Sequence, residues 1–140
     1  MIQANPINVT QIDHVVIRAK DIEAMVSFYQ EVLGFRLERG PAANGLAQLR
    51  AGTSLIDLVD MQSMLGKEGG DNPDPKAPNM DHVCFQVMPW DADKIIQHLN
   101  DRGVQCGAVS SRYGAQGQGP SIYLSDPEGN RIELKGQSIV

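Results

Sequence analysis

The chain has 140 residues, enough for one compact domain that buries a core without disulfides. Its net charge is −5 with 12 basic residues scattered along the sequence, and its two cysteines lack CxxC spacing, so neither a nucleic-acid surface nor a disulfide scaffold is expected. No apolar run approaches the ~18 residues that span a bilayer, and residues 1–8 do not resemble a signal peptide. We therefore expect a cytoplasmic protein without nucleic acid or membrane as a partner.

The first predicted strand covers residues 11–19, which alternate in the period-two pattern of a strand. This alternation places His14 and Arg18 on the same face. Asp21 then provides a helix N-cap, and apolar residues recur at helical spacing up to Gly34, a residue type common just beyond a helix C-terminus. The pattern predicts an amphipathic helix that covers one face of a sheet.

Three more strands are expected in the first half of the chain, so that this half has the order βαβββ. Glycine-rich or polar turns separate these strands, which cover residues 35–38, 46–50 and 55–59. Residues 62–79 then combine glycines, prolines and charges, a composition that does not bury a core. This segment is predicted to be a linker, and its length suggests mobility.

The second half of the chain repeats the same order. A helix is expected from the N-cap Asp91 to just before Gly103. Residues 126–129, Asp-Pro-Glu-Gly, have the residue types of a type I turn, so the last two strands should form a hairpin. The expected strands are residues 80–87, 105–109, 121–125 and 131–135.

Two histidines and two carboxylates occupy matching positions in the two halves. An Asp-His-Val triplet opens each half and contributes His14 and His82, and the strand that closes each half carries Asp57 or Glu133 among apolar residues. A carboxylate in a buried strand is uncommon unless it is paired or coordinating, because removing an isolated carboxylate from water costs many kcal/mol. If the four groups converge in one cavity, they make a metal site.

Such a ligand set suits Mn²⁺, Fe²⁺, Co²⁺, Ni²⁺ or Zn²⁺, and three or four protein ligands leave positions open for substrate oxygens. A lone strand histidine is more often a core residue than a ligand, but the repeated pairs favour the metal. For Asp57 the alternative is a structural carboxylate bonded to backbone or to Arg50. Cys84, on the face of His82, is interpreted as a small packing residue.

Residues 111–119 form a glycine-rich segment before a core strand. Arg112 and Tyr113 could close over a substrate there, whereas the lack of Gly-Lys-Ser/Thr excludes a P-loop. A plain connector is the alternative. Arg18, on the face of His14, is either a substrate anchor or a solvent-facing arginine, and its forked donors match a carboxylate or phosphonate.

The Asp-His-Val starts, together with Asp-Pro-Glu-Gly-Asn-Arg-Ile-Glu-Leu at residues 126–134, make the chain similar to the vicinal oxygen chelate superfamily. That superfamily includes glyoxalase I, fosfomycin-resistance enzymes, extradiol dioxygenases, methylmalonyl-CoA epimerase and bleomycin-binding proteins. The resemblance implies an α+β fold, the glyoxalase/bleomycin resistance/dioxygenase fold, in which two βαβββ modules form cupped mixed sheets around a divalent metal. We expect one domain over residues 9–136, with module one at 9–61, the linker at 62–79 and module two at 80–136.

The same resemblance implies that His14, His82 and Glu133 bind the metal. Asp57 takes the place of a fourth ligand that is usually glutamate. Because aspartate is one methylene shorter, Asp57 could instead hold a water on the metal or act as general base, and Glu133 is the other candidate base.

The resemblance also implies a small-molecule substrate and a homodimer whose sites often combine modules from two chains. Arg18 matches the arginine with which glyoxalase I holds a glutathione carboxylate, but Met61 stands where that enzyme uses an asparagine, so a role for glutathione stays open. The favoured function is a glyoxalase-type lyase or isomerase that acts on an oxygen-rich, anionic substrate through a metal-stabilised enolate or alkoxide. The alternatives are a fosfomycin-resistance-like transferase or hydrolase, an extradiol-type dioxygenase, and a bleomycin-type binding dimer that needs no metal.

Overall fold

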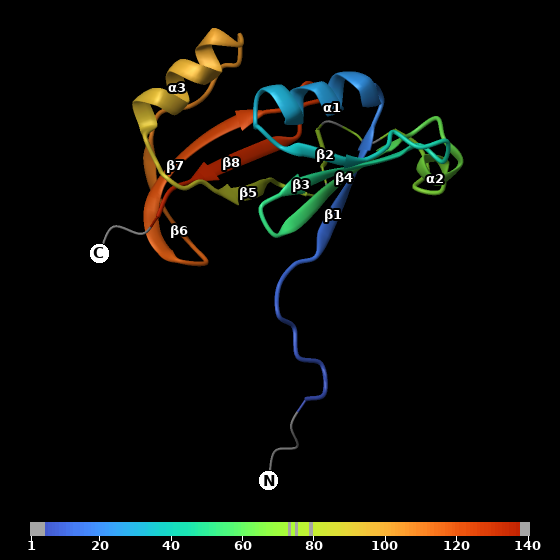
Figure 1. The fold of residues 1–140 in the computed structure, drawn as a ribbon, viewed down its shortest axis with the longest axis horizontal. Helices are drawn as coiled ribbons and strands as arrows, with labels where there is room; N and C mark the ends of the chain where they lie inside the picture. The colour runs from blue at the N-terminus through green and yellow to red at the C-terminus, as the bar shows by residue number, and fades with distance from the viewer. Residues whose placement is uncertain (1–4, 73, 75, 79, 138–140) are drawn as a thin grey trace.

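The chain forms two four-stranded mixed sheets that lie side by side (Figure 1). The computed structural model describes residues 5–72, 74, 76–78 and 80–137. The first sheet has the order β1-β4-β3-β2 and the second the order β5-β8-β7-β6, with one parallel pair in each. The elements of the first module are β1 (His14–Ala19), α1 (Ile22–Glu31), β2 (Arg36–Arg39), β3 (Leu46–Ala51) and β4 (Ser54–Asp60). Those of the second are β5 (Val83–Gln86), α3 (Ala92–Asp101), β6 (Ser110–Gly114), β7 (Gly117–Ser125) and β8 (Arg131–Lys135).

This architecture confirms the expected α+β fold with two βαβββ modules. The predicted helix starts are also confirmed, because the side chain of Asp21 accepts from the backbone N–H of Ala24 and that of Asp91 from Lys94. Gly34 follows α1 with φ +74°, a left-handed conformation that glycine adopts without strain.

One hydrophobic core joins the two modules. Figure 1 shows α1 and α3 on the same side of the two sheets, and α1 buries Met25, Phe28 and Tyr29 there. The strands contribute the inward half of their alternating side chains to this core. The other half faces the opposite side, which neither α1 nor α3 covers, and it carries the polar residues of the candidate site. The buried strand residues are Ile17, Ala19, Ala47, Leu49, Ile56, Leu58, Leu124, Ile132 and Leu134.

The turn between β7 and β8 fastens the second module to α1 of the first. Both carboxylate oxygens of Glu128 accept hydrogen bonds from the backbone N–H of Lys20, and one also accepts from Asp21 at the start of α1. The fully buried Tyr29 donates from its hydroxyl to Asp126 Oδ2 at 2.9 Å. Burial and the Asp126 charge raise the pKa of Tyr29, so the hydroxyl keeps its proton and its role as donor.

Replacing Tyr29 by phenylalanine is expected to lower the free energy of unfolding by about 1–3 kcal/mol, because the buried Asp126 carboxylate loses a donor. Urea denaturation at fixed protein concentration should show a lower midpoint with an unchanged slope. Tyr113→Phe is the matched control, since Tyr113 is 81% exposed and its loss should change stability by less than about 0.5 kcal/mol. Equal midpoints for Tyr29→Phe and the unmodified protein would contradict this assignment.

The expected strand at residues 105–109 is wrong. The strand lies five residues later, at β6, and residues 105–109 run beside β7 with a backbone hydrogen bond from Gly107 to Tyr123. The glycine-rich segment is therefore a hairpin of β6 and β7 rather than a loop. Gly114 pairs with Gly117, whose φ of +92° lets the chain reverse tightly between them.

The expected linker contains a short helix, α2 (Met64–Lys67), capped by Ser63. Residues 73, 75 and 79 of this linker lie outside the described residues. No helix in the described part of the chain is long and apolar enough to cross a membrane.

Candidate metal centre

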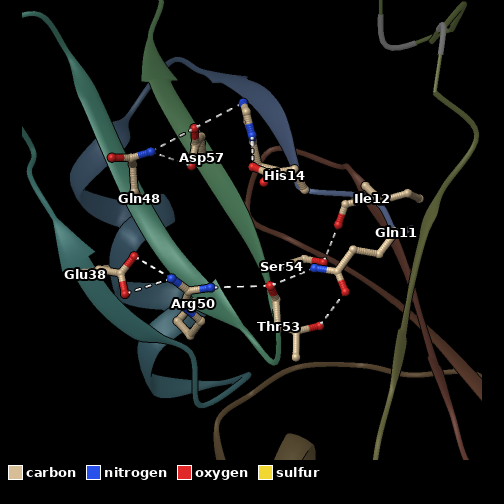
Figure 2. A network of polar contacts seen from close by, with 10 residues as sticks. Gln11, Ile12, His14, Glu38, Gln48, Arg50, Thr53, Ser54 and Asp57 are labelled. Atoms are coloured by element: carbon tan, nitrogen blue, oxygen red, sulfur yellow. Dashed lines mark hydrogen bonds and ion pairs between the residues drawn. The ribbon is translucent and has the colours of Figure 1, made fainter. Parts of the chain in front are cut away.

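The first module places His14 beside Asp57 on the side of the sheet that lacks a helix (Figure 2). His14 is the first residue of β1, and Asp57 lies on the neighbouring strand β4, 3% exposed. The imidazole Nε2 is 4.0 Å from Asp57 Oδ2. From the other side, Gln48 on β3 donates to the two Asp57 oxygens over long distances of 3.3 and 3.4 Å. Asp57 is therefore a buried carboxylate with weak hydrogen-bond partners.

The residue before His14 fixes the orientation of its ring. Asp13 Oδ1 is 2.7 Å from His14 Nδ1, so the proton of the neutral imidazole is favoured on Nδ1 and the lone pair on Nε2, toward Asp57. The hydrogen bond to Asp13 and the charge of Asp57 raise the pKa of His14 above its usual value. An imidazole held this way by a carboxylate is a good metal ligand.

The second module repeats this arrangement with a shorter separation. His82 Nε2 is 3.4 Å from Glu133 Oε1, and His82 Nδ1 is 2.7 Å from Asp81 Oδ2. The contact with His82 lowers the pKa of Asp81, so this carboxylate is ionised at neutral pH. Glu133 lies in the middle of β8 and is 5% exposed.

Glu133 differs from Asp57 in having strong hydrogen-bond partners. Cys84 Sγ donates at 3.2 Å and Ser121 Oγ at 3.0 Å to Oε2, and the Tyr123 hydroxyl donates to Oε1. Burial by itself raises the pKa of Glu133, but the donors Tyr123, Cys84 and Ser121, together with His82, outweigh it and lower that pKa. Glu133 is thus a firmly held carboxylate anion.

The same environment keeps the Cys84 thiol protonated. Partial burial of the sulfur, the hydrogen bond to Glu133 and the charge of that carboxylate raise the pKa of Cys84 to about 12. A thiol in this state donates a hydrogen bond and does not act as a nucleophile. Cys84 therefore has a more specific role than the packing predicted for it.

The two pairs occupy equivalent positions in the two sheets. Asp57 is in register with Gln48 on β3, and Glu133 is in register with Tyr123 on β7. Within one chain the pairs stay on separate sheets. In the described residues, no three or more histidine, cysteine, aspartate or glutamate side chains form a group that could hold a metal ion. The structure thus brings the four expected ligands together as two separate pairs, His14 with Asp57 and His82 with Glu133.

The expected substrate-binding residues have different surroundings. Arg18 donates to the backbone carbonyls of Gly66, Gly70 and Asp71, so its guanidinium holds the segment after α2. Its Nε is buried and lacks a hydrogen-bond partner among the described residues.

The other two expected residues, Arg112 and Tyr113, lie on the exposed strand β6. Tyr113 is 81% exposed. Arg112 lies close enough to Tyr123 to oppose the rise in the Tyr123 pKa that the hydrogen bond to Glu133 causes. Of these two residues, Arg112 is therefore the one near the site, because it lies beside Tyr123, which donates to Glu133.

Five residues of this site were missed by the sequence reasoning. Two of them had a signal, because an aspartate precedes the histidine in both triplets. The other three are recognised only when the strands are aligned, since each lies across from a site carboxylate or beside one. They are Asp13 and Asp81, which orient the imidazoles, and Gln48, Ser121 and Tyr123, which donate to the carboxylates.

Comparisons with known proteins agree with this fold. Residues 11–134 match the model of the family described as "Glyoxalase/Bleomycin resistance protein/Dioxygenase superfamily". The chain is 30% identical over 128 residues to virulence protein STM3117 of Salmonella typhimurium, covering 90% of this chain and 83% of that protein. The crystal structure of STM3117 superposes with a TM-score of 0.76 and 26% identity over 94% of this chain and 100% of that one.

Two further relatives carry different names. The chain is 33% identical over 138 residues to the glyoxalase domain-containing protein RDO1 of Mycosarcoma maydis, over 94% of this chain and 71% of that protein. It is 25% identical over 128 residues to metallothiol transferase FosB of Bacillus licheniformis, over 91% of this chain and 76% of that protein. Relatives of this kind agree on the fold and not on a reaction.

Proposed function

We propose that this chain, which belongs to the Glyoxalase/Bleomycin resistance protein/Dioxygenase superfamily, is a metal-dependent lyase or isomerase acting on a small, oxygen-rich, anionic molecule. One observation carries the proposal: a histidine Nε2 faces a buried carboxylate at equivalent positions of both modules. Each histidine is also oriented by its own aspartate. Metal-ligating histidines almost always have their second ring nitrogen bonded to a carboxylate, a backbone carbonyl or water, and both histidines here meet that condition.

We further propose that two chains pair to complete each site. One His–carboxylate pair supplies two ligands, and catalytic divalent metals are normally held by three or more protein groups. A twofold dimer can place His14 and Asp57 of one chain against the corresponding second-module residues, His82 and Glu133, of the other chain, and twofold dimers are the commonest oligomers. The nitrogen and carboxylate donors fit Mn²⁺, Fe²⁺, Co²⁺, Ni²⁺ or Zn²⁺.

The two carboxylates are suited to different roles. Glu133 accepts from three side chains and has a lowered pKa, so it is a weak base and a well-placed ligand. Among the described residues, Asp57 accepts only from Gln48 over 3.3 and 3.4 Å, which leaves lone pairs available for a proton. We therefore assign proton transfer to Asp57 and metal binding to Glu133 with the two histidines.

A bound divalent ion would supply electrostatic stabilisation of the negative charge that develops on a substrate oxygen when a proton is removed. The chain supplies the remaining parts. Asp57 takes and returns the proton, the buried setting of both carboxylates keeps water away, and Gln48 holds Asp57 on the open face.

Replacing Asp57 by asparagine is expected to lower turnover by about 100-fold or more, the usual contribution of a general base, while metal content falls less than about two-fold. Elemental analysis and steady-state rates must be measured on the same preparation. Gln48→Glu serves as a comparison, because it adds a charge beside Asp57 without removing that carboxylate. Parallel loss of metal and activity in Asp57→Asn would make Asp57 a ligand and contradict the assigned role.

The reaction itself is tested by a panel of substrates on protein loaded in turn with each of the five metals. The panel contains methylglyoxal with glutathione, fosfomycin with thiols or with water alone, and catechols. Isomerase or lyase activity on methylglyoxal with glutathione supports the proposed class of enzyme. Activity only on fosfomycin or catechols would identify a transferase, hydrolase or dioxygenase instead. Tight binding of a bulky cationic drug by metal-free protein, with no turnover, would identify a sequestering dimer.

A further inference from the structure

Lys135 is a buried cation without an acidic partner next to the candidate metal centre. It is the last residue of β8 and is 4% exposed. Within residues 5–72, 74, 76–78 and 80–137, no carboxylate lies within 4.0 Å of its Nζ and no hydrogen bond from Nζ is formed. Buried lysines are rare unless they are paired, because the ammonium loses its hydration.

The lysine lies on the same face as Glu133. Side chains two apart on a strand share a face, so Lys135 and Glu133 both point to the side that lacks a helix, with Cα atoms about 7 Å apart. Ser121 is directly across from Lys135 on β7, and its hydroxyl donates to Glu133. An anion bound at Lys135 would therefore belong to a molecule that also reaches the Glu133 carboxylate.

The glycine-rich hairpin of β6 and β7 makes the space for this side chain. A methyl group at Gly114 would lie 2.8 Å from Cε of Lys135, and one at Gly119 would lie 2.7 Å from Nζ. Neither glycine has a positive φ, so their backbone conformation does not require glycine. At Gly114 the close contact is with the Lys135 side chain, whereas at Gly119 the backbone oxygens of Gln137 and Gly136 would also lie 2.8 and 2.9 Å from the added methyl group.

Other cations near Glu133 are already engaged or exposed. Arg131 lies 3.8 Å from Asp81, with its guanidinium carbon 4.3 Å from the centre of the Tyr123 ring. Arg112 is exposed on β6. Among the described residues on this face, Lys135 is thus the buried cation that lacks an acidic neighbour.

We infer that Lys135, enclosed by the β6–β7 hairpin, is a binding site for an anionic group of the substrate, namely a carboxylate, phosphate or phosphonate. The largely buried Lys135 side chain leaves its ammonium group little room for water, and a bound anion would add charge-assisted hydrogen bonds to that group. The identity of the bound molecule as substrate rests on the proposed function. The anion site itself needs no metal, so it can be tested separately.

In the test, inorganic phosphate is titrated into chelator-treated full-length protein, and calorimetry measures the binding. The ionic strength is kept low, because charge interactions are then least screened. Lys135→Met is expected to weaken phosphate binding by at least about ten-fold. Lys94→Met removes the same charge from a side chain that is 87% exposed, and it should bind phosphate like the unmodified protein. Gly114→Ala keeps the charge but displaces the Lys135 stem, and it should also weaken binding.

Metal content is measured on the same variants. Lys135→Met should keep its metal, and His82→Ala should keep its phosphate affinity, so failure of the metal centre leaves the anion site intact. Phosphate binding by Lys135→Met equal to that of the unmodified protein would overturn the inference, as would no binding by the unmodified protein up to about 50 mM, far weaker than a specific site. If Lys135→Met does not fold, Gly114→Ala decides, and unchanged affinity there overturns the inference.

Discussion

A variant with alanine in place of His82 is expected to contain at least about ten-fold less divalent metal than the unmodified protein after purification without added metal. Changes to groups that merely orient a ligand already have effects of this size, and His82 is assigned as a direct ligand. Its Nε2 faces Glu133 at 3.4 Å, so its removal takes away the imidazole nitrogen of the second module. Elemental analysis of both proteins, purified in parallel, gives the comparison.

The control for this loss is His98→Gln. His98 lies on α3, and its Nε2 is 2.8 Å from the carbonyl oxygen of Val32, a contact that the glutamine amide can reproduce. This variant also lacks one imidazole, but it should keep full metal content. Full metal occupancy in His82→Ala would remove the metal centre as proposed.

Mixing two metal-deficient variants is expected to restore metal binding and activity to about a quarter of the unmodified level. The first variant is His14→Ala and the second is His82→Ala. If each site takes one module from each chain, a mixed dimer has one site with both histidines and one with neither. Random exchange makes half of the dimers mixed, and half of their sites are complete.

The measurement requires exchange of subunits, achieved by joint refolding or by expression of both variants with different affinity tags. A chain carrying both substitutions, mixed with either single variant, is the control, because none of its mixed dimers has a complete site. Full loss of activity in the mixture of single variants, with mixed dimers demonstrated by the two tags, would show that the site is not shared. A monomer that binds metal at micromolar concentration would refute the dimer itself.

Local features of the fold could be predicted because they depend on neighbours in the sequence. Asp21 and Asp91 cap helices that begin one residue later, and residues 131–135 form the predicted strand with the predicted bounds. The misplaced strand at 105–109 shows the limit. Residues 105–109 contain more apolar residues than residues 110–114, but the position of the strand depends on pairing with β7, a distant partner.

The site was predictable as two matching halves but not as a set of contacts. The repeated triplet and the strand carboxylates identified His14, His82, Asp57 and Glu133. Alternation says which side of a strand a residue faces, but it does not say which strands are neighbours. The contact of Tyr123 with Glu133 requires β7 to lie beside β8, which no local pattern states.

The division of the proposed ligands between two sheets would make metal uptake and pairing of chains one coupled equilibrium. A single chain offers an ion His14 at one place and His82 with Glu133 at another, whereas a pair of chains would bring these three donors to one place. Any ligand that binds only the assembled form stabilises it, so metal would favour assembly and dilution would favour release of metal. A cell could then set the amount of loaded protein through its expression level as well as through its metal supply.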